Sequence, residues 1–377
     1  MNNYALHLYQ PVVAGSDFEA NLSEWHDWRR SIRMQGGFWQ GSCWTEGDAG
    51  KLLDLFNRWL GCHVQERAGG VTSWEGLVYE LEITIGGAKR RRSLDDVVNA
   101  VACTYQSGGV VATTAYSTQD QSIARFGRKE DVLTLDNYPL ATAEAYRATF
   151  LKENTWPWPR PMALGAYGEA RLDLHACGYA FTANWMFVEE GDATTDDADD
   201  WLIDVVGMAT GLSSNHGGAT SGAGDCQFLK TKNVAANTLQ VAKQCLSPTR
   251  GWDLLAELAA LGDADGDPWQ VWVDTGRVVN YNQISVTPRY YMRRGVLYDT
   301  AGGRNAVNPW HVRPAVVRDL DYPVSGAGRG MYLTDNRDAF VEEVEVDAEG
   351  QIALRTATYL AEDVLGAQYA QYKPEEA

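Results

Sequence analysis

The chain has 377 residues, of which 45% are hydrophobic, and this is enough for about two to three domains with buried cores. Its formal net charge of -18 argues against a nucleic-acid-binding protein, since binding to phosphate backbones depends on lysine and arginine displacing counterions. No stretch approaches the ~20 consecutive apolar residues of a membrane span, and the first residues lack the basic flank and apolar core of a signal peptide. We therefore expect a soluble cytosolic product.

The N-terminal part of the chain, as far as Tyr138, has the pattern of short antiparallel strands around one helix. Asp48 is expected to cap this helix and Gly61 to stop it, while Gly36-Gly37 is expected to form a hairpin turn. Alternating apolar residues over 74–85 predict a strand with one buried face. Because open strand edges must be covered, we expect either a closed barrel or a sheet shared between subunits. The other expected elements are strands over 4–9, 31–34, 38–44, 62–67, 101–105 and 131–135, and a short helix over 119–125.

The rest of the chain mixes helices and strands. Residues 155–161 are expected to form an extended connector after a helix over 140–151, because prolines cannot continue a helix. The strand pattern returns at Trp269, with a turn at Thr275-Gly276-Arg277 and a last hairpin around Ala348-Glu349-Gly350. Between them we expect strands within 172–187, helices after a Thr195 cap and over 237–246 and 251–261, and a glycine-rich loop over 213–224. The predicted fold class is therefore β-rich α+β.

The six cysteines and the high number of tryptophans are both explained by structural roles. The six cysteines contain no CxxC pair, so free thiols are favoured over disulfides or a zinc site. Tryptophan is frequent, with 14 in the chain. Exposed tryptophans occur on sugar-binding surfaces, but large aromatic residues also dominate buried cores and obligate interfaces, and we favour the latter interpretation. The cysteines are Cys43, Cys62, Cys103, Cys177, Cys226 and Cys245.

Two acidic segments are candidates for metal or catalytic sites. Asp263, Asp265 and Asp267 alternate as in a calcium loop, but an EF-hand needs glycine and glutamate where this chain has Pro268 and Asp274. An acidic turn before the next strand is therefore favoured. The second segment has the residue types of a metal site or a glycosidase carboxylate pair, yet a polar loop and a first helical turn explain it equally. Its members are Glu189, Glu190, Asp192, Asp196, Asp197, Asp199 and Asp200.

The nucleophilic and basic residues do not indicate a specific catalytic or binding site either. His216 and Cys226 flank the glycine-rich loop, but no strand-to-helix elbow positions them as a catalytic pair. The basic run Lys89-Arg90-Arg91-Arg92 is expected to meet carboxylates of a neighbouring subunit. The other histidines are isolated and show no metal-ligand spacing; they are His7, His26, His63, His175 and His311. We predict no catalytic, cofactor-binding or metal-binding residue, and a protein that is not an enzyme.

Two segments resemble the tail hub proteins of tailed bacteriophages. One is the strand with Trp74-Glu75-Gly76, which follows the helix that stops at Gly61. The other is Ser122-Ile123-Ala124-Arg125-Phe126-Gly127-Arg128-Lys129-Glu130. The family has a Trp-x-Gly strand and a Ser-x-x-x-Tyr-Gly-x-x-Glu-like segment, and this chain departs from it at Phe126, where tyrosine is common. Weaker similarity continues through Trp185 to the C-terminal hairpin, so the resemblance covers most of the chain.

The resemblance implies an assembly protein. Hub proteins of this type carry two tube-like barrels, so that three copies form a pseudo-sixfold ring between a sixfold tail tube and a threefold tip. Tube-forming antiparallel β-barrel domains are therefore expected at 1–138 and 285–377, flanking a mixed α+β middle domain at 139–284. The implied partners are two further copies of the chain, a tail tube or distal tail protein, tail tip or fibre proteins and a tape measure protein. The implied location is the phage tail of the virion, after synthesis in the host cytoplasm.

The acidity of the chain agrees with such a role. A negative inner wall would repel the DNA backbone, so that the genome passes through the ring without specific binding. Two alternatives stay open. One is a hexameric distal tail protein or another minor tail protein, and the other, from a different class, is a tryptophan-rich carbohydrate-binding adhesin or glycan hydrolase.

Overall fold

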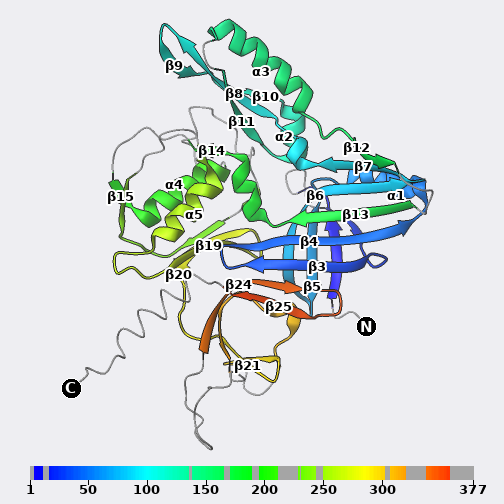
Figure 1. Cartoon of the computed structure of the whole chain (residues 1–377), viewed down its shortest axis with the longest axis vertical. Helices are drawn as coiled ribbons and strands as arrows, with labels where there is room; N and C mark the ends of the chain where they lie inside the picture. The colour runs from blue at the N-terminus through cyan, green and yellow to red at the C-terminus, as the bar shows by residue number, and fades with distance from the viewer. Residues whose placement is uncertain are drawn as a thin grey trace, which may run out of the picture.

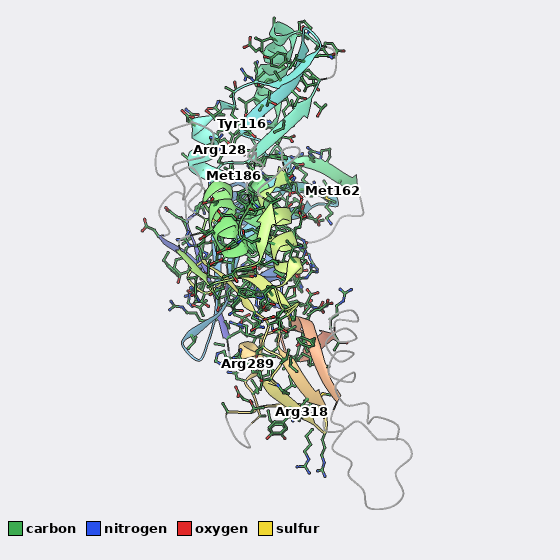
Figure 2. The ribbon with its side chains drawn as sticks, turned by 90° about the vertical axis from the view of Figure 1, so that its left-hand side faces the viewer. Tyr116, Arg128, Met162, Met186, Arg289 and Arg318 are labelled. Atoms are coloured by element: carbon green, nitrogen blue, oxygen red, sulfur yellow. The ribbon has the colours of Figure 1, made fainter. Side chains whose placement is uncertain are left out.

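The computed structural model describes residues 4–11, 17–135, 138–164, 170–188, 195–210, 228–229, 231–242, 249–301, 306–319 and 337–356. Strands contain 49% of the residues and helices are few, which agrees with the predicted β-rich α+β class. The molecule is elongated, with a projection at one end, a large sheet in the middle and the C-terminal strands at the other end (Figure 1). In the view turned by 90°, Tyr116 and Arg128 lie near the base of the projection, and Arg289 and Arg318 lie toward the opposite end (Figure 2). None of the helices in these ranges is long and apolar enough to cross a membrane.

The centre of the fold is a curled antiparallel sheet built mainly from the N-terminal residues. Its strands follow the order β2 (Phe18–Asn21), β1 (Tyr4–Tyr9), β5 (His63–Ala68), β6 (Val71–Ile85), β13 (Ala170–Cys177), β4 (Gly36–Gly47) and β3 (His26–Arg33). The sheet curls far enough for Trp28 of β3 to reach Glu66 of β5 across the core. Among the described residues, however, no ladder joins the end strands β2 and β3, which are linked by residues 22–25. A closed barrel is therefore not confirmed.

The local signals in this sheet acted largely as predicted. The side chain of Asp48 accepts a hydrogen bond of 2.9 Å from the backbone N–H of Lys51 and caps α1 (Ala49–Arg58). Gly61, three residues after this helix, has a φ of 82°, which suits glycine. The predicted burial of a single face is found in the second half of β6. Residues 73–78, by contrast, are buried on both faces. In that first half β6 is covered on both sides, which alternation alone does not reveal.

Further strands pair with β6 and β4, two strands inside this order. On one side β6 pairs with β7 (Ala88–Ser93), which pairs with β12 (Arg160–Leu164). On the other side β4 pairs in parallel with β19 (Trp269–Asp274), which continues into β20 (Val278–Gln283) and β16 (Thr231–Val234). The main core fills the inside of the curl; among its largest fully buried side chains are Trp28, Trp74, Phe38, Phe56 and Leu8.

A second group of elements, which we call the projecting module, stands away from the large sheet (Figure 1). Its central strand β8 (Ala100–Ser107) pairs with β11 (Glu130–Thr134) on one side and with β9 (Val110–Thr113) and β10 (Ser117–Thr118) on the other. The helix α3 (Leu140–Asn154) packs against β8. The helix α2 (Asp120–Phe126) lies between this module and the main core, to which it contributes Phe126.

The middle of the chain differs from the sequence prediction in three places. After β13 it forms the 3-10 helix η2 (Tyr179–Trp185) rather than strands throughout. Thr195 begins β15 (Thr195–Asp197) instead of capping α4 (Ala198–Thr210). The helix predicted over 237–246 is wrong where the structure describes it, because Gln240–Ala242 forms β17 and pairs with β15, and residues 243–248 lie outside the described ranges. Two further elements are β14 (Phe187–Val188), paired with β18 (Thr249–Arg250), and the correctly predicted helix α5 (Gly251–Leu261).

The C-terminal strands form a smaller unit with its own core around Trp310, Tyr290 and Val344. Its elements are β21 (Tyr290–Arg293), β22 (Val296–Asp299), β23 (Val316–Asp319), β24 (Arg337–Val346), β25 (Ile352–Thr356) and the short helix η3 (Pro309–His311). Another short helix, η1 (Leu94–Asp96), precedes β8 and packs Leu94 in the main core. β24 pairs with β3, so this unit is joined to the large sheet. Strands from all three predicted domains thus share one sheet, while the domain boundaries at 138 and 284 stay a prediction.

Candidate functional site

Two buried segments each hold several secondary-structure elements together, and we call them joints. The first is Trp74-Glu75-Gly76. Trp74 is completely buried and lies edge-on to Trp28, with 5.4 Å between the ring centroids. Its indole N–H donates a hydrogen bond of 3.2 Å to the backbone oxygen of Ser31, so strand β6 is fixed to strand β3 through the core. Trp74 is therefore a core residue, as we predicted for most tryptophans.

Glu75 extends this joint to the β19–β20 hairpin. It is 3% exposed, and its carboxylate accepts a hydrogen bond of 2.9 Å from the backbone N–H of Arg277. Arg277 sits in the turn between β19 and β20 with a φ of 64°, a conformation that side chains other than glycine rarely adopt. Burial raises the pKa of Glu75, and the backbone N–H groups of Arg277 and Gly276 counteract this rise. A carboxylate that holds a turn in place has a positioning role.

Gly76 allows the backbone of β13 to come close. A Cβ atom at this position would lie 2.2 Å from the backbone oxygen of Cys177 and 2.5 Å from the Trp74 ring. The backbone oxygen of Gly76 also lies 3.1 Å from the Nδ1 atom of His63, and the same nitrogen lies 2.6 Å from the Tyr179 hydroxyl. The three residues of the motif thus connect the core, a turn and a neighbouring strand.

The Ser122–Glu130 segment forms the second joint, at the base of the projecting module. The Ser122 hydroxyl donates to the backbone oxygen of Thr155 at 2.8 Å. The carboxylate of Glu130 accepts from Arg128 at 2.7 Å and from the backbone N–H of Phe187 at 2.9 Å. The segment therefore links α2, the connector after α3 and the strand β14.

Asn99, which no sequence pattern singles out, organises this second joint. It is fully buried, and its side-chain N–H group donates to the Ser122 hydroxyl at 3.2 Å and to the backbone oxygen of Gly127 at 2.8 Å. Its side-chain oxygen accepts from the backbone N–H of Lys129 at 2.7 Å. A lone asparagine between Val98 and Ala100 carries no spacing signal, so only the fold reveals this role.

Lys129 is the most unusual charge of the second joint. It is 6% exposed, its ammonium donates to the backbone oxygen of Leu94, and it lies 4.6 Å from the centroid of the Trp185 ring. Burial lowers the pKa of Lys129 from its ordinary value of 10.5 to about 8. The folded chain thus releases this proton at a lower pH than the unfolded chain does.

We expect Lys129→Met to change how stability depends on pH. Between pH 8 and 10.5 the unfolded chain binds this proton and the folded chain does not, so this residue makes the wild-type free energy of unfolding rise with pH. The rise amounts to up to about 3 kcal/mol and should be absent in Lys129→Met. Urea unfolding at pH about 7 and about 10 measures it. The exposed Lys51→Met serves as the control, and an equal rise in wild type and Lys129→Met would contradict the assignment.

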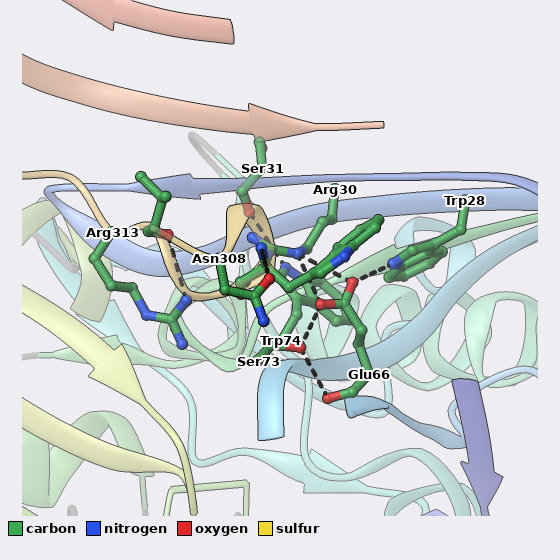
Figure 3. A network of polar contacts seen from close by, with 10 residues as sticks. Trp28, Arg30, Ser31, Glu66, Ser73, Trp74, Asn308 and Arg313 are labelled. Atoms are coloured by element: carbon green, nitrogen blue, oxygen red, sulfur yellow. Dashed lines mark hydrogen bonds and ion pairs between the residues drawn. The ribbon is translucent and has the colours of Figure 1, made fainter. Parts of the chain in front are cut away.

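A buried charge network ties the C-terminal unit to the large sheet (Figure 3). The guanidinium of Arg30 donates to both carboxylate oxygens of Glu66, at 3.1 and 3.0 Å, and to the backbone oxygen of Trp310 at 2.7 Å. Trp28 donates to Glu66 at 2.5 Å, and the Ser73 hydroxyl also donates to it. Arg30 and Glu66 are 2% and 0% exposed, so this ion pair is shielded from water. The network fixes η3 of the C-terminal unit against strands β3 and β5.

The face of the sheet opposite the main core carries a groove of about 900 Å³, lined by parts of β3, β4, β6, β13, β24 and β25. Charges of both signs lie in it: Glu343 of β24 pairs with Arg33 at 3.2 Å and with Arg355 at 3.8 Å. His175 of β13 lies opposite Glu80 of β6 in the same lining. A broad lining of mixed charge suits contact with a protein surface better than enclosure of a small ligand.

The basic run of β7 is engaged within its own chain. Lys89 pairs with Glu82, and Arg91 pairs with Glu80 at 3.3 Å; both carboxylates belong to the neighbouring strand β6. Their acidic partners in the structure thus belong to the same chain, and a contact of the run with carboxylates of another subunit stays a prediction. Strand pairing places the acids of β6 opposite the bases of β7, a proximity that sequence separation hides.

The acidic candidates act as turn and helix residues where they are described. One carboxylate oxygen of Asp263 accepts from the backbone N–H groups of Asp265 and Asp267 at 3.0 and 2.9 Å, and the other accepts from the Trp269 indole at 3.0 Å. These bonds lower the pKa of Asp263 and confirm an acidic turn. In the second segment Asp199 and Asp200 lie in the first turn of α4, and Asp196 and Asp197 lie in β15, while Glu189, Glu190 and Asp192 fall outside the described residues.

The remaining candidates are cysteines and histidines. Within the described ranges no group of three or more histidine, cysteine or acidic residues could hold a metal ion. Cys43, Cys62, Cys103 and Cys177 are buried free thiols, as predicted, and burial raises the pKa of Cys62 to about 11. His216, Cys226 and Cys245 lie outside the described residues. The described histidines occupy separate places: His7, His26, His63, His175 and His311 lie on β1, β3, β5, β13 and η3.

Comparison with known proteins finds similar solved structures, among them two tail proteins. Neither a protein-family model nor a curated protein matches the sequence. The chain is similar to the crystal structure of a 43 kDa tail protein of prophage MuSo2 from Shewanella oneidensis, with a TM-score of 0.43 and 7% identity over 94% of this chain and 96% of that chain. It is similar to the same extent, with the same values, to a tail protein from Neisseria meningitidis MC58. A TM-score of 0.43 does not establish a common fold, so we draw the functional proposal from the chain's own residues.

Proposed function

We propose that the chain is a structural, non-enzymatic component of a phage tail tip or baseplate. In this proposal it is a trimeric hub that joins a sixfold tail tube to a threefold tip and continues the DNA channel. Its partners are two further copies, the tail tube or distal tail protein, the tip or fibre proteins and the tape measure protein. Its location is the tail of the virion.

The observation that carries this proposal is the nature of the two motif segments. Both are built as joints, with Trp74, Glu75 and Gly76 fixing three strands together and Glu130 fixing the projecting module to β14. Residues that position strands and turns suit a protein whose task is mechanical. This agrees with the sequence resemblance, which selected the same two segments for an assembly role.

The arrangement of the strands gives further support. The curled sheet and the C-terminal unit are the two strand-rich parts that a hub would use for its tube-like barrels, and β24 connects them. Completing each barrel falls, in the proposal, to strands of neighbouring copies. The strong negative charge of the chain would keep a DNA backbone from adhering to the channel wall.

Mass measurement and electron microscopy test this function. Light scattering on the purified chain should give the mass of three copies, and averaged images should show a threefold ring that is coaxial with a tube in assembled particles. A sixfold ring would favour the distal tail protein instead. A monomer that binds glycans on an array, and loses this binding on exchange of the exposed Trp158 for alanine, would favour the carbohydrate-binding alternative and overturn the hub.

A further inference from the structure

The hairpin of β8 and β9 exposes apolar side chains at the far end of the projecting module. Val110 and Val111 are 68% and 69% exposed, the highest values among the large hydrophobic residues that the structure describes. Because neighbouring residues of a strand point to opposite faces, the two valines leave both faces of the hairpin in water. Figure 1 shows β9 at the outer limit of the module, away from the large sheet. We call residues 104–113 the hairpin arm.

The strand β9 is also an open sheet edge. Its ladder runs from Val110, opposite Ser107, to Thr113, opposite Thr104, without a bulge, and within the described ranges β9 pairs with β8 alone. Soluble proteins usually protect such an edge with a lysine, a proline or a bulge, because unpaired backbone groups recruit further strands. The Val-Val-Ala-Thr sequence of β9 carries none of these protections.

The module itself gives the hairpin arm little support. Only Ala143 of the 15-residue helix α3 is buried, while Leu140 and Tyr146 are 42% and 50% exposed. A hairpin that is solvated on both faces is marginally stable by itself. An arm of this kind gains most of its order from a surface that covers it.

Charge points to the kind of surface. No Asp, Glu, Lys or Arg occurs between Asp96 and Asp120, although 22% of the chain is charged. Two chains of net charge -18 repel each other, so contact between copies costs least where the surface carries no charge. A nucleic acid would need lysine or arginine, and the arm offers neither.

We propose that the hairpin arm docks onto a second copy of this chain, with β9 adding as a strand to an open sheet edge of the neighbour. Main-chain hydrogen bonds would supply the register, and the two valines would be buried by the neighbour's side chains. A ring of three needs a head-to-tail contact, so the arm of each copy meets a different surface of the next. The inference rests on the proposed function, because it names the surface by which the hub forms.

The test replaces both valines with lysine, as Val110→Lys/Val111→Lys, and measures mass by sedimentation velocity. The control is Val71→Lys, since Val71 is 58% exposed at the end of another hairpin. Wild type and control should form the same oligomer, while the arm variant should raise the dissociation constant roughly 100-fold or more. Its circular dichroism should match that of the wild type, because both side chains are exposed in the single chain.

Hydrogen exchange gives a second measurement that does not depend on the variant. The amides of β9 that face away from β8 should exchange slowly in the oligomer and quickly after dilution to the monomer. An arm variant that keeps the wild-type mass, or β9 amides that exchange equally fast in oligomer and monomer, would overturn the arm while leaving the hub intact. Equal dissociation of the arm variant and the control would overturn it as well. A wild-type chain that stays monomeric would remove both the arm contact and the trimeric hub.

Discussion

Gly76→Ala is expected to lower the free energy of unfolding by about 3 to 4 kcal/mol, one of the largest effects of any single methyl group in this chain. The added Cβ would lie 2.2 Å from the backbone oxygen of Cys177, a distance that real Cβ atoms essentially never show. The oxygen belongs to the centre of the sheet, between β6 and β4, so the clash cannot be relieved by turning a side chain. β13 would have to move away from β6, and the Trp74 ring, 2.5 Å from the added Cβ, would have to shift from its contact with Trp28.

Urea unfolding followed by tryptophan fluorescence measures this loss. Gly50→Ala provides the matched control, because a Cβ on Gly50 meets only one atom within 4 Å, a side-chain oxygen of Asp48 at 3.2 Å. Gly50 lies in α1, where alanine is favoured over glycine by up to about 1 kcal/mol. The control should therefore stay within about 1 kcal/mol of the wild type. Equal stabilities of the two variants would show that β13 adapts to the methyl group and that Gly76 is not required.

Local signals in the sequence predicted most of the individual elements. The Asp48 cap, the Gly61 stop and the β19–β20 hairpin with its turn at Gly276 all form as expected, because each depends on backbone preferences of neighbouring residues. The helix α5 begins and ends at the predicted residues for the same reason. Apolar spacing and turn chemistry act over a few residues, and these are the distances that a single sequence displays.

The errors arise where contacts between distant segments decide the structure. Asn237 was placed in a helix, but its side chain accepts from the backbone N–H of Leu239 and donates to the Tyr281 hydroxyl at 2.8 Å. Such local bonds of asparagine compete with a helix, and pairing with β15 then makes β17 a strand. Long-range pairing likewise puts β13 between β6 and β4, a position that no pattern in β13 indicates.

The sequence indicates where the two motif segments lie but not which residues they contact. The sequence resemblance singled out the Trp74 strand and the segment ending at Glu130, and both proved to be joints. The contacts that make them joints come from elsewhere in the chain, from Arg277, Phe187 and Asn99. These partners carry no recognisable spacing, because they are brought to the joints by the fold and not by sequence proximity.

The second large effect is expected at the buried ion pair between Arg30 and Glu66. Glu66→Gln keeps the shape of the side chain but removes the negative charge that balances Arg30 in a site without water. A second guanidinium, that of Arg313, lies close to Arg30. Burial is the larger cause and the charge of Arg30 the next, and together they lower the pKa of Arg313 to about 10. Without Glu66 the two cations would face each other unbalanced. We expect a loss of about 3 to 5 kcal/mol in the free energy of unfolding.

A double-mutant cycle separates the ion pair from the packing around it. Arg30→Met alone leaves the Glu66 carboxylate buried without its cation and also removes the bond to the Trp310 backbone oxygen, so it should cost a similar amount. The double variant should lose at least about 2 kcal/mol less than the sum of the single variants, because neither charge is then left unbalanced. Asp54→Asn is the control, since Asp54 pairs with Arg58 at 2.7 Å in water and its loss should cost less than about 0.5 kcal/mol. Additive losses at Arg30 and Glu66 would mean that the charges contribute nothing to each other, and that the β24–β3 ladder and the packing around Trp310 hold the C-terminal unit.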